Sequence, residues 1–293
     1  MIKTLKGDEK MLVDGHTHTE LCPHGSGEST EKMVQRAIRM GFQRYCITEH
    51  APLPPAFQTE LAGDPVGYTE ASLRVDQVDD YLDLARVLQA KYANQIDISI
   101  GFEVDFLPGY EAWTKQFLAQ YGAQTEENIL SVHFMRGAQG HFWCIDLSTT
   151  DFQAGFSQWF EDPQRLFEQY YRTVLSSVQA DFGPYTPQRI GHMSLVRKYQ
   201  DYFGLTAPLD SANLALVDQT LARIKQQDRE LDLNFAGLYK PECNDFYPGN
   251  QILVRAQKLG IPLVYGSDAH DIKSVGHGYH LIKKLINGWQ MPC

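Results

Sequence analysis

The chain has 293 residues, of which 43% are hydrophobic and 21% charged, with a formal net charge of −10. This size suits one large α/β domain, and the sequence holds no apolar run long enough to span a membrane. The acidic balance and the lack of a Lys/Arg block argue against nucleic acid as the main partner. Five cysteines without a CxxC pair, and no N-terminal signal pattern, lead us to expect a cytoplasmic protein.

Seven short apolar segments predict buried strands. Each is rich in β-branched or aromatic residues and ends at Gly, Pro or polar residues. They are residues 11–16, 44–50, 96–104, 129–134, 189–193, 231–237 and 262–270.

Helical patterns lie between these strands. One begins at Ser29 and ends at Gly41, and two others cover residues 75–92 and 213–227, with apolar side chains at helical spacing. Seven strands that alternate with helices predict a parallel sheet, and a closed barrel is the natural shape for that number of strands.

Two long segments interrupt the alternation. Residues 51–69 carry four prolines and two glycines, and residues 135–157 form a second insert. We expect both to be irregular loops that act as lids or substrate walls, because loops of this length in compact domains are usually functional.

Side chains that bind metals recur at the ends of the predicted strands. In a parallel barrel all of these ends meet on one face, and residues two apart on a strand point to the same side. We therefore expect nine groups to converge: His16, His18, His24, His50, Glu103, His133, His192, Asp268 and His270.

The mixture of imidazole and carboxylate ligands suits Zn²⁺, Mn²⁺ or Fe²⁺ better than Mg²⁺ or Ca²⁺. Nine ligands exceed the needs of one catalytic ion, so we expect two or three ions, with Glu103 and Asp268 as bridging carboxylates. Such a site activates water and clamps the oxygens of a phosphate, which predicts phosphoester hydrolysis.

Six motifs, in the order DGHTHT, ITEH, GFEVDF, SVHF, GHM and GSDAH, resemble those of the PHP (polymerase and histidinol phosphatase) family. Within that family, GHTHTELCPHGSG, ITEHAPLP and GFEVDFLPGYE are most similar to histidinol-phosphate phosphatases. The resemblance implies a distorted (β/α)7 TIM-like barrel, a single domain over residues 1–293, with its metal site at the C-terminal ends of the strands. It also implies hydrolysis of L-histidinol phosphate to L-histidinol and inorganic phosphate, in histidine biosynthesis.

The resemblance further implies how the ligands are shared. His16, His18, Glu103 and Asp268 would hold one ion; Glu103, His133 and His192 a second; and His24, His50 and His270 a third.

Three residues are candidates for catalysis. Asp268 or His270 could orient the attacking water or handle its proton. Arg197, five residues after His192, is our candidate to bind the substrate phosphate, because a guanidinium grips phosphate through two hydrogen bonds.

Recognition of the substrate's ammonium and imidazole calls for carboxylates or aromatic rings. The insert at 135–157 and the loop around residue 243 both offer them, and the sequence does not choose between the two. Asn234, on the strand without a ligand, could also face the site. The candidate residues for substrate recognition are therefore His141, Trp143, Asp146, Asp151, Glu242, Asp245 and Asn234.

Three other functions stay open from the sequence. A PHP-type exonuclease or phosphodiesterase would share the metal site. An amidohydrolase also begins with HxH, but typically uses a bridging lysine carbamate where this chain has Glu103. A non-catalytic metal-binding protein would bind ions without hydrolysing any ester. The sequence leaves the oligomeric state open.

Overall fold

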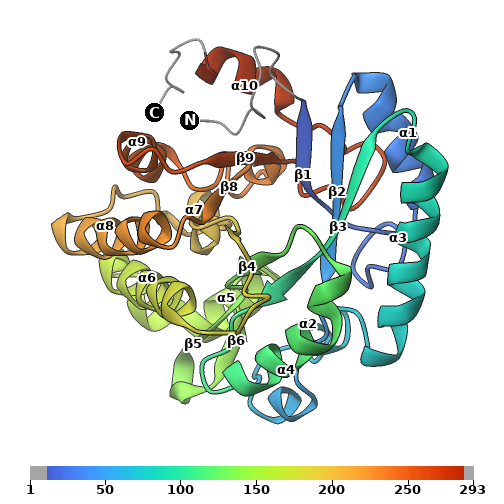
Figure 1. Ribbon diagram of the computed structural model, residues 1–293. Helices are drawn as coiled ribbons and strands as arrows, with labels where there is room; N and C mark the ends of the chain where they lie inside the picture. The colour runs from blue at the N-terminus through green and yellow to red at the C-terminus, as the bar shows by residue number, and fades with distance from the viewer. Residues whose placement is uncertain (1–11, 287–293) are drawn as a thin grey trace.

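The computed structural model describes residues 12–286, which are built around one sheet of seven parallel strands (Figure 1). The strands lie side by side in the order β1-β2-β3-β4-β7-β8-β9, which is also their order along the chain. Their bounds are β1 Val13–Thr17, β2 Arg44–His50, β3 Asp97–Asp105, β4 Ile129–Ser131, β7 Arg189–Ile190, β8 Glu230–Asn234 and β9 Leu263–Gly266.

The two edges of this sheet meet where β1 and β9 end. Thr17 forms a parallel bridge with Ala269, and the amide of His18 donates to the carbonyl of Ala269 at 2.9 Å. The amide of Asp268 donates to the carbonyl of His16 at 2.8 Å. The sheet is therefore a nearly closed barrel. Because β4 and β7 contain only three and two residues, the barrel is distorted, as predicted.

Helices surround the strands (Figure 1). The three predicted helices are confirmed, and α1 ends at Gly41, whose φ of 85° lies in the left-handed region that glycine favours. Three of the longer helices, α4, α6 and α9, were not predicted. The bounds are α1 Thr30–Met40, α3 Val78–Tyr92, α4 Glu111–Tyr121, α6 Pro163–Gln179, α8 Ser211–Gln226 and α9 Asn250–Lys258, with shorter α2 Val66–Thr69, α5 Thr149–Phe156, α7 Gln200–Phe203 and α10 Tyr279–Ile286.

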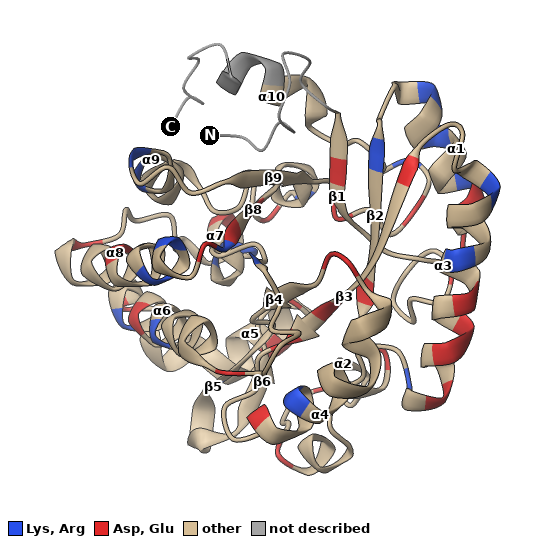
Figure 2. Cartoon of the chain, viewed as in Figure 1, with Lys and Arg blue, Asp and Glu red and all other residues tan. Residues whose placement is uncertain are grey.

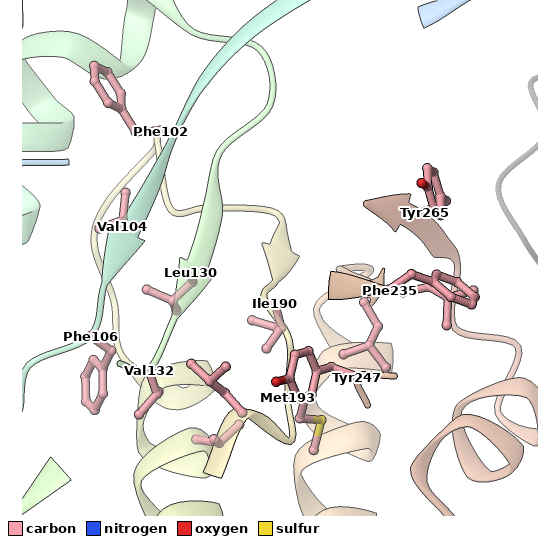
Figure 3. Close-up of a cluster of buried hydrophobic side chains, with 14 of the residues drawn as sticks. Phe102, Val104, Phe106, Leu130, Val132, Ile190, Met193, Phe235, Tyr247 and Tyr265 are labelled. Carbon is pink, nitrogen blue, oxygen red and sulfur yellow. The ribbon is translucent and has the colours of Figure 1, made fainter. Parts of the chain in front are cut away.

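Packing of the apolar face of strand β3 directs the polar side chains of this strand into the barrel. Phe102 and Val104 point to the helices, and the Phe102 ring lies 5.0 Å from that of Phe117 on α4 (Figure 3). Because side chains alternate along a strand, Glu103 and Asp105 must point the other way, into the barrel. Burial of the apolar side therefore fixes the direction of both carboxylates.

The two inserts fold against each other. Residues 135–157 do not form an irregular loop: they contain most of a hairpin of β5 (Phe134–Arg136) and β6 (Phe142–Cys144), followed by α5. Residues 51–69 contain a 3-10 helix, Pro55–Thr59, and α2. The ring of Phe57 lies 5.1 Å from those of Phe134 and Phe142. This second, smaller core makes one wall beside the strand ends.

Charged residues are spread over the outside of residues 12–286. Figure 2 shows Lys and Arg on several outer helices, interspersed with Asp and Glu, rather than gathered on one of them. Within the same residues, no helix combines the length and apolar character that crossing a membrane requires.

Candidate metal centre

The strand ends bring the predicted ligands together. His16, His50 and Glu103 lie within β1, β2 and β3, and the other groups follow the strand ends or, for His24, lie in the loop after β1. All of them except His24 and the partly exposed Asp268 and His270 are buried.

The Glu103 carboxylate lies at the centre of the cluster. Its Oε2 lies 3.2 Å from Nε2 of His16 and 3.2 Å from Nδ1 of His50. Its Oε1 lies 2.7 Å from Nε2 of His192 and 3.5 Å from Nε2 of His133. Each carboxylate oxygen thus faces a different set of histidines, which is the arrangement of a bridging ligand.

These histidines also control the charge of Glu103. Burial by itself would raise the pKa of the Glu103 carboxyl, but His16, His133 and His50 outweigh it and hold the pKa well below its usual range. Glu103 is therefore a carboxylate near neutral pH, as a metal ligand must be.

Asp268 completes the group around His16 and His18. Its Oδ1 lies 3.1 Å from Nε2 of His18 and 3.7 Å from Nε2 of His16. Its Oδ2 accepts a hydrogen bond from Nδ2 of Asn234 at 3.1 Å. The φ of Asp268 is 54°, a left-handed conformation that is uncommon outside glycine and tends to occur at functional sites. The sequence-based suggestion that Asn234 faces the site agrees with this contact.

A third group of imidazoles lies beside His18. Nε2 of His24 lies 3.1 Å from Nε2 of His270, and the ring of His24 lies 4.9 Å from that of His50. These three residues come from the loop after β1, the end of β2 and the segment after β9.

Carboxylates behind three of the histidines hold their rings in place. Nδ1 of His16 lies 2.8 Å from Asp232, Nδ1 of His133 lies 2.8 Å from Asp105, and Nδ1 of His18 lies 3.1 Å from Glu49. A histidine that donates its Nδ1–H to a carboxylate presents a bare Nε2 to a metal, and such partners strengthen metal binding. These three carboxylates were not among the residues predicted from the sequence.

The cluster fits divalent cations. Nε2 of His133 lies 3.2 Å from Nε2 of His192, and paired ring nitrogens at this distance need a proton or a cation between them. Nε2 of His16, Nδ1 of His50 and Oε2 of Glu103 are buried and face one another without forming a well-directed hydrogen bond, and Nε2 of His50 has no hydrogen-bond partner. Buried polar atoms normally have partners. Coordination of a metal ion would satisfy these atoms.

Comparison with known families now identifies the chain. The PHP domain model matches residues 14–236. The chain belongs to the PHP family. A Bacillus subtilis protein named histidinol-phosphatase is 35% identical over 266 residues, which cover 91% of this chain and 96% of the relative.

Solved structures agree with this placement in the PHP family. The crystal structure of a candidate histidinol phosphatase from Listeria monocytogenes has 42% sequence identity and a TM-score of 0.87, covering 92% of this chain and 99% of that one. The structure of histidinol phosphate phosphatase from Lactococcus lactis, complexed with Zn, L-histidinol and phosphate, has 20% identity and a TM-score of 0.65, covering 93% of each chain. At this identity the Lactococcus structure shows the shared fold.

A cavity opens onto the metal centre of this PHP protein. Its volume is about 320 Å³, which suits a small ligand. The two inserts contribute to its walls through Val66, Gly67, Cys144 and Asp146. Seven of the nine predicted ligands line it: His24, His50, Glu103, His133, His192, Asp268 and His270.

The structure does not bring Arg197 to this PHP site. Its Nη2 donates to the carbonyl of Ala207 at 2.8 Å, and its guanidinium lies 4.3 Å from the centre of the Phe167 ring. The next residue, Lys198, lines the cavity instead, and its Nζ lies 3.3 Å from Oδ2 of Asp146. The expectation that Arg197 binds phosphate is corrected, because the 3-10 turn Leu195–Arg197 points the two neighbouring cations in different directions.

Of the residues considered for substrate recognition, only Asp146 lines the cavity. Asp151 instead exchanges hydrogen bonds with Ser148 at the start of α5. The cavity wall also holds Glu70, Lys240 and Asp271, which no motif in the sequence pointed to.

Proposed function

We propose that this protein hydrolyses L-histidinol phosphate to L-histidinol and inorganic phosphate, as a step of histidine biosynthesis. The observation that carries the proposal is the Glu103 carboxylate, whose two oxygens face separate groups of histidines on the floor of a cavity. The Bacillus subtilis relative named histidinol-phosphatase supports the choice of substrate, as does the Lactococcus lactis protein of the same fold that binds Zn, L-histidinol and phosphate.

We assign the ligands of two or three Zn²⁺, Mn²⁺ or Fe²⁺ ions as the resemblance implies. Such ions, when bound, lower the pKa of water and neutralise phosphate oxygens. His16, His18, Glu103 and Asp268 would hold one ion; Glu103, His133 and His192 a second; and His24, His50 and His270 a third.

Asp268 is the residue that we propose to orient the attacking water. Its side chain lines the cavity and is 16% exposed, whereas that of Glu103 is 1% exposed. Burial alone would raise the pKa of Asp268, but the neighbouring His16 and His18 hold it well below its usual range. The carboxylate can therefore accept a hydrogen bond from water. His270, which also lines the cavity, is the second candidate for this role.

Lys198 is the residue that we propose to bind the substrate phosphate directly. Asp146, its partner, belongs to the segment after β6, where the amide of Ile145 donates to the carbonyl of His133 at 2.9 Å. This bond places the Lys198–Asp146 pair beside the His133 end of the centre. An ammonium there would neutralise a phosphate oxygen that points away from the ions.

Carboxylates on the cavity wall suit the cationic part of the substrate. Glu70 and Asp271 line the cavity together with His24 and His270. Their negative charges complement the positive charge of an ammonium or imidazolium group. This complementarity favours a cationic leaving group over a nucleotide.

A cytoplasmic location agrees with the four described cysteines, all of which are free thiols.

The substrate proposal is tested by phosphate release from four compounds with the metal-loaded protein. L-histidinol phosphate is compared with p-nitrophenyl phosphate, a neutral alkyl phosphate and a short single-stranded DNA. We expect the highest kcat/KM for L-histidinol phosphate. Equal turnover of the simple esters, or release of nucleotides alone, would contradict the assignment and favour a general phosphatase or an exonuclease.

A further inference from the structure

The Cys22 thiol lies among the imidazoles of the third ion site, and the proposed function gives it no role. Cys22 is 4% exposed. Its Sγ forms a group with ring nitrogens of His18, His50 and His270, in which all ligand atoms lie within 4.8 Å of one another. Its Sγ also lies 3.6 Å from Nε2 of His24.

Two distances, both involving His24, match those between donor atoms around one tetrahedral ion. Zinc–sulfur bonds of about 2.3 Å and zinc–nitrogen bonds of about 2.0–2.1 Å place S and N about 3.5 Å apart, and two N atoms about 3.3 Å apart. The Cys22–His24 distance is 3.6 Å and the His24–His270 distance is 3.1 Å. The thiol therefore occupies the position that a fourth ligand would take.

His50 provides independent evidence that this group holds an ion. It is 5% exposed, and its Nε2 has no hydrogen-bond partner; its Nδ1 lies 3.2 Å from Oε2 of Glu103 without forming a well-directed hydrogen bond. Leaving a buried imidazole nitrogen unpaired is unfavourable unless a ligand satisfies it. His50 belongs to the same group of ligand atoms as Cys22, so the ion that satisfies His50 lies within reach of the thiol.

We propose that Cys22 is the fourth protein ligand of the ion held by His24, His50 and His270. The thiol releases its proton to water as the metal–sulfur bond forms, because the thiolate is the ligand. A soft thiolate favours Zn²⁺ or Fe²⁺ over Mn²⁺ at this position. The other two ions, held by imidazole and carboxylate alone, lack this preference. This inference concerns the ion site and does not depend on which ester is hydrolysed.

A competing arrangement keeps the thiol protonated. Glu49 lies close enough to accept a hydrogen bond from Cys22. If the thiol donates this bond, the sulfur packs beside the metal ligands and does not coordinate an ion. The two arrangements differ in whether a metal–sulfur bond exists, which spectroscopy detects without any substrate.

The test loads the chelated full-length protein with Co²⁺, counts bound ions by elemental analysis, and records the absorption spectrum. We expect three cobalt ions per chain and an intense sulfur-to-cobalt charge-transfer band in the near ultraviolet. Cys22→Ser should lose the band and bind one ion at least roughly tenfold more weakly, by comparison with the 10–100-fold loss that follows removal of an outer partner.

Cys144→Ser is the matched control. Cys144 is also buried and lines the same cavity, but its thiol donates to Oδ1 of Asp146 at 3.2 Å, so its removal should leave the band intact. A band that persists in Cys22→Ser would overturn the proposal, as would a fully loaded wild type without the band or binding of only two ions. Failure of the substrate assignment would appear separately, as an absence of histidinol phosphate turnover.

Discussion

Nδ1 of His16 lies 2.8 Å from Oδ2 of Asp232, although 216 positions separate the two residues in the sequence. Both side chains are fully buried. The contact fixes the His16 ring so that Nε2 faces Glu103 at 3.2 Å. The carboxylate on β8, a strand without a metal ligand of its own, thereby controls a ligand on β1.

Asp232→Asn should lower metal affinity by about 10–100-fold, because the amide holds the His16 ring less firmly and removes a negative charge behind it. Competition with a chromophoric chelator measures this. Asp181→Asn, at an exposed carboxylate that accepts a hydrogen bond from Lys115, is the control and should bind metal like the wild type. Equal affinities in the two variants would show that Asp232 does not support the centre.

Lys198→Met should raise both KM for L-histidinol phosphate and the inhibition constant for inorganic phosphate by roughly 10–100-fold, the loss of one hydrogen bond to a charged group. Metal content should not change. Arg197→Met is the matched control, because Arg197 bonds to backbone carbonyls away from the cavity. A higher KM in Arg197→Met with normal kinetics in Lys198→Met would restore the sequence-based assignment.

Gly266→Ala should disturb the contact between His16 and Asp232. A Cβ at Gly266 would lie 2.6 Å from Cβ of His16 and 2.8 Å from Oδ1 of Asp232. We expect a loss of about 1–3 kcal/mol in the free energy of unfolding, typical of overpacking, together with weaker metal binding. Urea denaturation and the chelator competition measure the two effects, and a variant unchanged in both would contradict this account of the close approach.

The free energy of unfolding of the metal-free protein should depend on pH through the titration of His18. Burial alone would lower its pKa, but Asp268 and Glu49 outweigh burial and raise the pKa to about 9. The unfolded value is about 6.5. A pKa that is higher in the folded state contributes stability that is complete below pH 6.5 and is lost as the pH rises through 9.

Urea unfolding of the chelated protein across this pH range tests the sign. The free energy of unfolding should fall from pH 6.5 to 9, and His18→Asn should remove that part of the decrease. Metal affinity should rise over the same range, because a bound histidine must be neutral. A wild type and His18→Asn variant with parallel pH profiles would contradict the assignment.

The sequence was sufficient to predict the convergence of the cluster because every ligand except His24, which lies in the loop after β1, stands at or near the end of an apolar strand. Glu103 illustrates this, since the alternating Phe102 and Val104 require it to point inward. The supporting carboxylates were not predictable in the same way. Asp232 precedes Asn234 on a strand without ligands, and only the closed barrel brings it to His16.

Local conformation also limited the prediction. Arg197 and Lys198 are adjacent, and no periodic pattern shows which of them the turn after His192 directs into the cavity. The hairpin of β5 and β6 has strands of three residues each, too short for alternation to be recognised. Its position depends on contacts with Phe57 in the other insert, which a local pattern does not contain.

The most direct test of a metal-dependent histidinol phosphatase centred on Glu103 is phosphate release from L-histidinol phosphate by chelated and reconstituted protein. We predict that chelation abolishes turnover, that Zn²⁺ or Mn²⁺ restores it, and that Glu103→Gln remains inactive and deficient in bound metal after the same treatment. Turnover that survives chelation, or a Glu103→Gln variant as active as the wild type, would contradict the account.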